Sequence, residues 1–307
     1  MRYLLRTLAV ACSLALAGPG AAVRARETPA APAAAKAVTA ATARPALWKI
    51  ADPDTTIYLF GTVHALPAGI DWLHGPVADA LKQSAQLVTE IPATEASEMQ
   101  AAVMKSATLP AGQTLRGMLA ANDRARFEQA LAQFNLPAAA FDGFQPWYAA
   151  IALTSLPLAQ GGYTAANGVE HAVAAVAQQQ GKQRTGLETA SHQLAMFASL
   201  PLEVQKRYLH EVLEGLPTLD QQLTDIIREW SAGNPDKLAE LLNEEQDDPV
   251  MIKVLLTDRN RMWVDWARLR MEQPGTVFMA VGAGHLGGGE GMLGLLAKAG
   301  LEPVRIQ

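Results

Sequence analysis

The chain has 307 residues, of which half are hydrophobic and 18% are charged, so it can bury a substantial core in one large domain or two small ones. Its formal net charge is −5, from 30 acidic and 25 basic residues. This balance disfavours nucleic acid as a partner, because a surface that binds phosphates needs clustered Lys and Arg.

The N-terminal 25 residues have the pattern of a secretory signal peptide. Arg2 and Arg6 come first, a short apolar run covers residues 8–17, and small residues follow it. About ten apolar residues are too few to span a membrane, which takes about 20. We therefore expect residues 1–25 to be cleaved on export across the inner membrane, leaving a periplasmic or extracellular protein with no stable membrane insertion. The alternative is a short membrane anchor. The single cysteine, Cys12, lies in this segment, so the mature chain offers no thiolate.

Residues 26–46 are mostly Ala, Pro and Thr and show no apolar periodicity. Such a segment cannot bury enough surface to order itself, so it is expected to be a flexible linker. The sequence thus divides into a signal peptide at 1–25, a linker at 26–46 and one folded domain at 47–307.

Within the domain, β-branched and aromatic runs predict strands, mostly near the two ends, at 56–60, 86–91, 183–187, 276–281 and 304–306. Helical patterns occupy 73–84, 95–106, 122–134, 146–156, 168–180, 191–198, 202–214, 219–232, 235–244, 249–271 and 292–299. A strand, helix and strand within about 35 residues favours a βαβ unit with parallel strands. The expected fold is α/β, with a mixed central sheet built from N- and C-terminal βαβ units and a large, mostly helical middle.

The first and last long strands end in the same motif. Each is a hydrophobic run followed by glycine, two residues and histidine, which gives Gly61 to His64 and Gly282 to His285. Ligands of open α/β sheets gather at the carboxyl ends of the strands, and glycine lets the backbone turn there. If the two strands are neighbours, the two imidazoles meet at one edge of the sheet. The alternative for either histidine alone is a hydrogen bond to a loop carbonyl.

A carboxylate is expected beside these histidines, because Glu90 ends the second strand of the N-terminal βαβ unit. Two imidazoles and a carboxylate with an open position make a hydrolytic metal site. The sequence therefore predicts a divalent metal bound by His64, His285 and Glu90. With nitrogen and oxygen ligands only, zinc, manganese and cobalt all suit this set.

These motifs resemble those of the TraB/GumN family, which includes the Tiki metalloproteases that act on Wnt proteins. The resemblance covers residues 47–307 and rests on Tyr58–His64, the Glu90 strand, Gly168-Val169-Glu170, Gly186–Thr189, Asp258-Arg259-Asn260 and Gly282–Leu286. It implies a metal-dependent hydrolase fold whose paired histidines and a glutamate form the site, with peptidase activity in the Tiki branch. Position 170 departs from the pattern, since it holds Glu where many relatives have Asp.

Three further residues are candidates for catalysis, together with Glu90. Glu170, at the start of a predicted helix, and Glu188, after a short strand, are each a possible general base or a residue that orients the base. An acid at the start of a helix also simply complements the helix dipole. Arg259 can orient a carboxylate or stabilise an oxyanion, and the alternative is a surface ion pair.

The expected function is that of an exported metal-dependent hydrolase, in particular a peptidase, that acts on a peptide or a small amide or ester. The metal would lower the pKa of a bound water and polarise the scissile carbonyl. One alternative is a metal-independent, esterase-like hydrolase that uses His and Glu. It is suggested by the looser similarity of the TraB/GumN family to erythromycin-esterase-like proteins. Another is a non-catalytic periplasmic protein that binds a peptide or signal in the same cleft.

Overall fold

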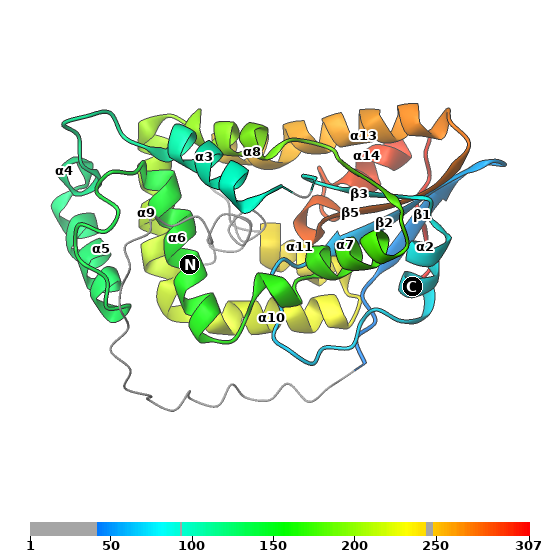
Figure 1. Cartoon of the computed structure of the whole chain (residues 1–307), viewed down its shortest axis with the longest axis horizontal. Coiled ribbons are helices and arrows are strands. Elements are labelled where there is room, and N and C mark those ends of the chain that lie inside the picture. The colour runs from blue at the N-terminus through cyan, green and yellow to red at the C-terminus, as the bar shows by residue number, and fades with distance from the viewer. Residues whose placement is uncertain (1–41, 93, 244–247) are drawn as a thin grey trace.

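The computed structural model describes residues 42–92, 94–243 and 248–307 (Figure 1). The predicted signal peptide and most of the predicted linker lie outside these residues. The last part of that linker, residues 42–46, packs against the domain: Ala43 and Ala46 are buried, and the amide of Ala43 donates to the carbonyl of Asp71 at 2.7 Å. The packed region thus begins a few residues before 47, because these amides find backbone acceptors in the domain.

A six-stranded mixed sheet organises the molecule, with strand order β4-β3-β5-β2-β1-β6. Its strands are β1 (Leu47–Ala51), β2 (Thr55–Thr62), β3 (Gln86–Thr89), β4 (Gln183–Gly186), β5 (Gly275–Gly282) and β6 (Val304–Arg305). Four neighbours, β4, β3, β5 and β2, run parallel, whereas β1 is antiparallel to β2 and to β6. The predicted α/β class and its mixed sheet are confirmed, and strands from both ends of the sequence lie side by side.

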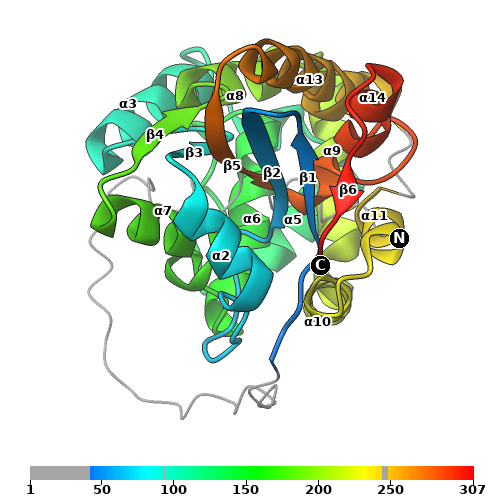
Figure 2. The same cartoon turned by 90° about the vertical axis from the view of Figure 1, so that its right-hand side faces the viewer.

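Helices cover both faces of this sheet and extend beyond it. They are α2 (Gly75–Gln83), α3 (Ala96–Ala107), α4 (Leu115–Met118), α5 (Ala121–Gln133), α6 (Pro146–Gln160), α7 (Val169–Gln179), α8 (Ala190–Ala198), α9 (Leu202–Gly215), α10 (Leu219–Ser231), α11 (Pro235–Asn243), α12 (Pro249–Ile252), α13 (Asp258–Met271) and α14 (Met292–Lys298). Figure 2 shows α13 and α14 on one side of the sheet and α2, α7 and α10 on the other. Helices α4, α5, α6 and α9 form a helical part beyond one end of the strands, on the left of Figure 1.

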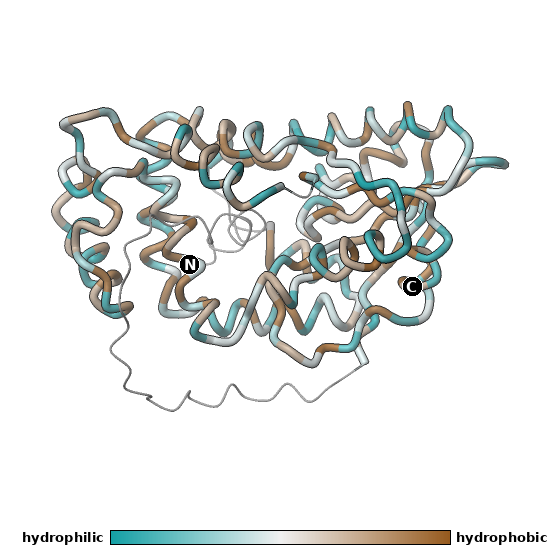
Figure 3. The backbone as a smooth tube through the Cα atoms, viewed as in Figure 1, coloured by the Kyte–Doolittle hydropathy of each residue, from teal (hydrophilic) through white to brown (hydrophobic). Residues whose placement is uncertain are grey.

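Alternation along the central strands gives each face of the sheet its own hydrophobic core. Along β5, Val277, Met279 and Val281 face the smaller core with α13 and α14, whereas Phe278 and Ala280 face the larger core shared with the helical part. The helices alternate between hydrophilic and hydrophobic stretches, as Figure 3 shows, because each buries only one side. The sheet is therefore fixed from both faces, and its strand ends are rigid positions for side chains.

The observed elements differ from the expectation in three places. Strand β1 and the short helix α4 were not predicted. The helix expected over 249–271 is divided, since a π-helix (Lys253–Thr257) separates α12 from α13. Within the described part of the chain, no helix combines the length and apolar character that crossing a membrane requires.

Candidate active site

The two Gly-x-x-His motifs meet at one edge of the sheet. Strands β2 and β5 are adjacent and parallel, with Thr62 opposite Gly282, so both chains leave the sheet at the same level. His64 follows β2, and His285 ends a short 3-10 helix after β5. A Cβ on Gly61 would lie 3.1 Å from the Cα of Ala283, so glycine permits the close approach of the two segments. The neighbouring placement predicted from the repeated motif is what the fold contains.

Two of the predicted glutamates reach the same edge from β3 and β4. Pairing continues past the ends of these strands, because the amide of Glu188 donates to the carbonyl of Glu90 at 2.8 Å. A Cβ on Gly186 would lie 2.3 Å from Cδ of Pro92, so a larger residue there would push the two segments apart. Both glutamates are buried, at 7% and 8% exposure.

Arg259, on α13, links these groups through every donor it has. Its Nε donates to Glu188 at 2.9 and 3.2 Å, and Nη2 donates to Glu188 at 3.1 Å and to Glu90 at 2.6 Å. Its Nη1 donates to the carbonyl of Leu255 at 3.1 Å and lies 3.0 Å from Nε2 of His285. All five guanidinium N–H groups are thus engaged, which fits the predicted role of orienting carboxylates and leaves no donor for an oxyanion. The alternative of a surface ion pair is wrong, because the Arg259 side chain is 3% exposed.

The protonation of His285 follows from its neighbours. A guanidinium cannot accept a hydrogen bond, so Nε2 of His285 accepts from Arg259, and Nδ1 carries the proton. That proton points to Oδ1 of Asn260, 2.7 Å from Nδ1. Asn260 is held in turn, because its Nδ2 donates to the carbonyl of Glu290 at 2.8 Å. His285 is therefore a neutral imidazole whose single lone pair is directed at Arg259.

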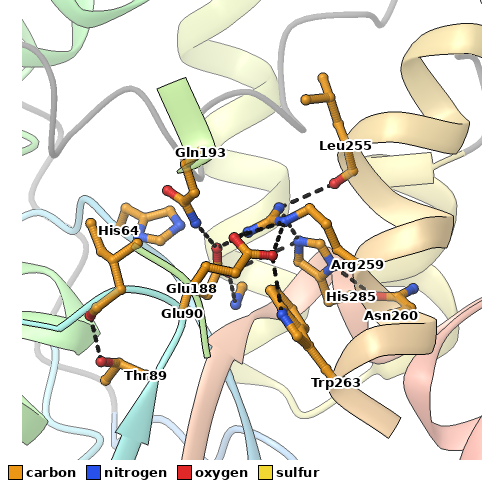
Figure 4. A network of polar contacts seen from close by, with 12 residues as sticks. His64, Thr89, Glu90, Glu188, Gln193, Leu255, Arg259, Asn260, Trp263 and His285 are labelled. Carbon is orange, nitrogen blue, oxygen red and sulfur yellow. Dashed lines mark hydrogen bonds and ion pairs between the residues drawn. The ribbon is translucent and has the colours of Figure 1, made fainter. Parts of the chain in front are cut away.

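Glu90 is surrounded by donors (Figure 4). Its Oε1 accepts from the amide of Gly282 at 2.7 Å, and its Oε2 accepts from Arg259 and from Nε2 of Gln193, the latter at 3.0 Å. Burial opposes the charge of Glu90, but the guanidinium of Arg259, together with His64 and the Gly282 amide, outweighs burial and lowers the pKa of this carboxyl to about 2. Glu90 is thus a fixed anion at neutral pH.

His64 forms a separate pair with Glu170. Its Nδ1 lies 2.7 Å from Oε1 of Glu170, and its Nε2 is buried with no hydrogen-bonding partner among the described residues. Burial lowers the pKa of His64, but the Glu170 carboxylate outweighs burial, so the pKa is raised above its ordinary value. A Cβ on Gly168 would lie 2.0 Å from the carbonyl oxygen of His64, and the amide of Val169 donates to the carbonyl of Val63 at 3.1 Å. Gly168 therefore allows α7 to start directly against the loop that carries His64.

The three predicted metal ligands do not present a common set of open lone pairs. In this set, Nε2 of His64 keeps an open lone pair, because it has no hydrogen-bonding partner among the described residues. The lone pair of His285 and three acceptor positions of Glu90 are already used by donors of the protein. Across residues 42–92, 94–243 and 248–307, no group of three or more His, Cys, Asp or Glu residues is arranged to hold a metal ion. As arranged, with Arg259 in place, these residues do not fit a divalent metal.

Two contributors to the network were not anticipated as such. Gln193, on α8, supplies an amide donor to Glu90, and Trp263 donates from Nε1 to Glu188 at 3.1 Å. The ring of Trp263 also lies 4.4 Å from that of His285. The one signal in the sequence was a glutamine among apolar residues at 193, on a helix face that would otherwise read as core.

Comparisons with known proteins agree with the arrangement of motifs. The model of the TraB/PrgY/gumN family matches residues 46–305, nearly all of the described fold. Searches of curated proteins and of solved structures found no match. Because the matched range covers most of the chain and includes both Gly-x-x-His motifs, the chain belongs to the TraB/PrgY/gumN family.

Proposed function

We propose that this protein hydrolyses an amide or ester bond, in a peptide or a small molecule, with His64 as the general base that activates water. The observation that carries the proposal is the buried Nε2 of His64, which has no hydrogen-bonding partner in the described part of the chain, on a ring whose Nδ1 faces Glu170 at 2.7 Å. A carboxylate on one nitrogen orients the imidazole and stabilises its protonated form, which prepares the other nitrogen to take a proton.

In the proposed reaction, Nε2 of His64 removes a proton from water while the water oxygen bonds to the substrate carbonyl carbon. Glu170 stabilises the imidazolium that forms. When the bond to the leaving group breaks, the same proton passes from Nε2 to the leaving amine or alkoxide. Water is thereby divided between the two products, and His64 returns to its starting state.

The other carboxylates suit a positioning role better than that of a base. Glu188 accepts from Arg259 and from Trp263, and Glu90 accepts three hydrogen bonds and holds its proton weakly. A carboxylate with the hydrogen bonds and the neighbouring positive charge of Glu90 binds a proton poorly at neutral pH, and the oxygens of Glu188 are already engaged as acceptors. We assign Glu90, Glu188 and Arg259 to fixing the edge of the sheet around His285, and Glu170 to orienting His64.

The test is hydrolysis of a panel of peptide and ester substrates by His64→Ala, with His192→Ala as the matched control, since His192 is exposed on α8. We expect His64→Ala to lose at least about a hundredfold in kcat/KM, the usual contribution of a positioned base. His192→Ala should keep wild-type activity. If folded His64→Ala hydrolyses the panel at the wild-type rate, or if it keeps the biological function in full, base catalysis at this site is refuted.

Metal-dependent hydrolysis is the second candidate, favoured by the open Nε2 of His64, which is the atom through which imidazole commonly binds a metal. Elemental analysis of gently purified protein, combined with assays in chelator, separates the two candidates. Full activity in metal-free protein supports the proposal above. Activity that disappears in chelator and returns with manganese, zinc or cobalt supports the metal-dependent form instead.

A further inference from the structure

The guanidinium of Arg259 is the centre of a buried cluster of hydrogen bonds and ion pairs. It joins α13 to β3, to the segment after β4 and to the segment after β5, through Glu90, Glu188 and His285. These three side chains belong to the class that binds divalent metals, yet each directs an acceptor atom at the same guanidinium. The question is which cation this cluster is built to hold.

We propose that Arg259 is the resident cation of the cluster, and that its guanidinium and a divalent metal are mutually exclusive occupants of the space between Glu90, Glu188 and His285. The wild-type protein then binds no divalent metal through His285 and Glu90. Removing the Arg259 side chain converts the cluster into a metal site. This inference depends on contact geometry and does not require that the protein be a hydrolase.

The lone pair of His285 is already occupied by the guanidinium of Arg259. A neutral imidazole has one lone pair, and at 3.0 Å from Nη1 of Arg259 it is already used as an acceptor. Nδ1 cannot substitute, because it faces Oδ1 of Asn260 at 2.7 Å. A metal needs this lone pair at a distance of about 2.0–2.1 Å, which a guanidinium in its present position prevents.

Charge leads to the same conclusion. The two buried carboxylates need a compensating cation. Arg259 supplies it through a bidentate contact with Glu188 and a 2.6 Å hydrogen bond to Glu90. Three neutral donors, on Gly282, Gln193 and Trp263, stabilise the remaining negative charge. Together these satisfy the carboxylates without a metal, and a second cation between them would be repelled by the guanidinium.

Local backbone structure also holds Arg259 in place. The π-helix Lys253–Thr257 directly precedes α13, and the carbonyl of Leu255 within it accepts from Nη1 of Arg259 at 3.1 Å. π-helical turns are rare and occur often at functional sites. For a metal to enter, Arg259 would have to leave a backbone acceptor, an imidazole and two carboxylates at once while 3% exposed.

The experiment is calorimetric titration of chelator-treated protein with Mn²⁺ and with Zn²⁺. Wild type and Arg259→Lys, which keeps a positive charge, should show no binding that depends on His285. Arg259→Met should bind one equivalent, and its melting temperature should rise with added metal. Should Arg259→Met fail to fold, Arg259→Met/Glu188→Gln removes one carboxylate with the cation and is the variant to titrate.

Two results of the titration would overturn the proposal. Metal binding by wild type that His285→Ala abolishes overturns the proposal, and so does a folded Arg259→Met or Arg259→Met/Glu188→Gln that binds no metal. Wild-type binding that survives His285→Ala lies elsewhere and agrees with the proposal. Hydrolysis is not measured in this titration, so a failed assay for the proposed function leaves its result standing.

Discussion

His64 and Glu170 form a histidine–carboxylate pair at the carboxyl edge of the sheet. The two side chains are 12% and 27% exposed, so the pair is largely shielded from water. The glutamate at 170, where the resemblance led us to expect aspartate in many relatives, reaches Nδ1 of His64 at 2.7 Å. The extra methylene therefore does not prevent the contact.

This pair predicts a specific pH dependence. The pKa of His64 is raised mainly by Glu170 against the effect of burial, so the proposed base is protonated, and unable to accept a proton, at low pH. We expect kcat/KM to increase with pH through a value above the ordinary imidazole pKa. Glu170→Gln removes the carboxylate charge and should shift the rising limb to lower pH, while also reducing the maximum rate. A profile in Glu170→Gln that coincides with wild type would exclude Glu170 as the partner of His64.

At the scale of elements, the site depends on how closely loops and helix ends approach one another. Helix α7 begins against the His64 loop only because residue 168 has no side chain. Motif glycines are easily assigned to turns, but here the requirement is close contact between segments distant in sequence, which a single sequence does not display.

Gly168→Ala should therefore separate α7 from the His64 loop. The added methyl would meet the carbonyl oxygen of His64 at 2.0 Å, so backbone must shift, at a cost of roughly 1–3 kcal/mol for such overpacking. We expect a lower melting temperature and a loss of activity comparable to that of Glu170→Gln. The matched control is Gly143→Ala, which has nothing within 4 Å of its Cβ and should change neither quantity. Equal behaviour of the two variants would contradict this role for Gly168.

Much of the element order was predictable from sequence, and the exceptions have physical causes. The hydrophobic runs of β2 and β5 and the helical periodicity of α9 and α10 follow from which faces they bury. Strand β1 was missed because Leu47–Ala51 is short and carries a lysine, and because its partners β2 and β6 define it. The π-helix changes hydrogen-bond register without changing the apolar pattern, so the sequence gives no sign of it.

The sequence also predicted part of the site. Repeated motifs at strand ends correctly indicated that His64, His285 and Glu90 lie at one sheet edge. Whether a lone pair is open depends on neighbours from distant elements. For His285 and Glu90, that neighbour is Arg259, which uses their acceptor atoms. The predicted residues thus meet, while the chemistry available to them differs from that of an open metal site.

At the scale of the whole molecule, Glu90 links the sheet to two helices. It receives donors from β5, α8 and α13, so its charge stabilises the contact of the sheet with α8 and α13. The pKa of Glu90 is lowered from 4.5 to about 2 in the folded state. A carboxyl with a lowered folded pKa stabilises the fold above its unfolded pKa, and this stabilisation is lost as the pH falls through the folded pKa.

Glu90→Gln should consequently be less stable than wild type at neutral pH, with the difference shrinking as the pH falls from about 4.5 towards 2, where wild-type Glu90 becomes protonated. Denaturant unfolding at pH 7, 4 and 3 measures this. Glu302→Gln, which alters an exposed glutamate, serves as the control and should follow wild type at each pH. Wild-type and Glu90→Gln stabilities that decline in parallel would disprove the assignment.

The position of β5 in the sheet has a consequence for when the sheet can be completed during synthesis. This strand lies between β3 and β2, yet it begins at residue 275, so nothing joins the β1–β2 pair to the β3–β4 pair until β5 has been synthesised. His285 arrives later still. Pairing between strands that are far apart in the sequence slows folding. Ribosome-bound or truncated chains that end before β5 therefore lack both the finished sheet and the cluster of contacts between Arg259 and His285.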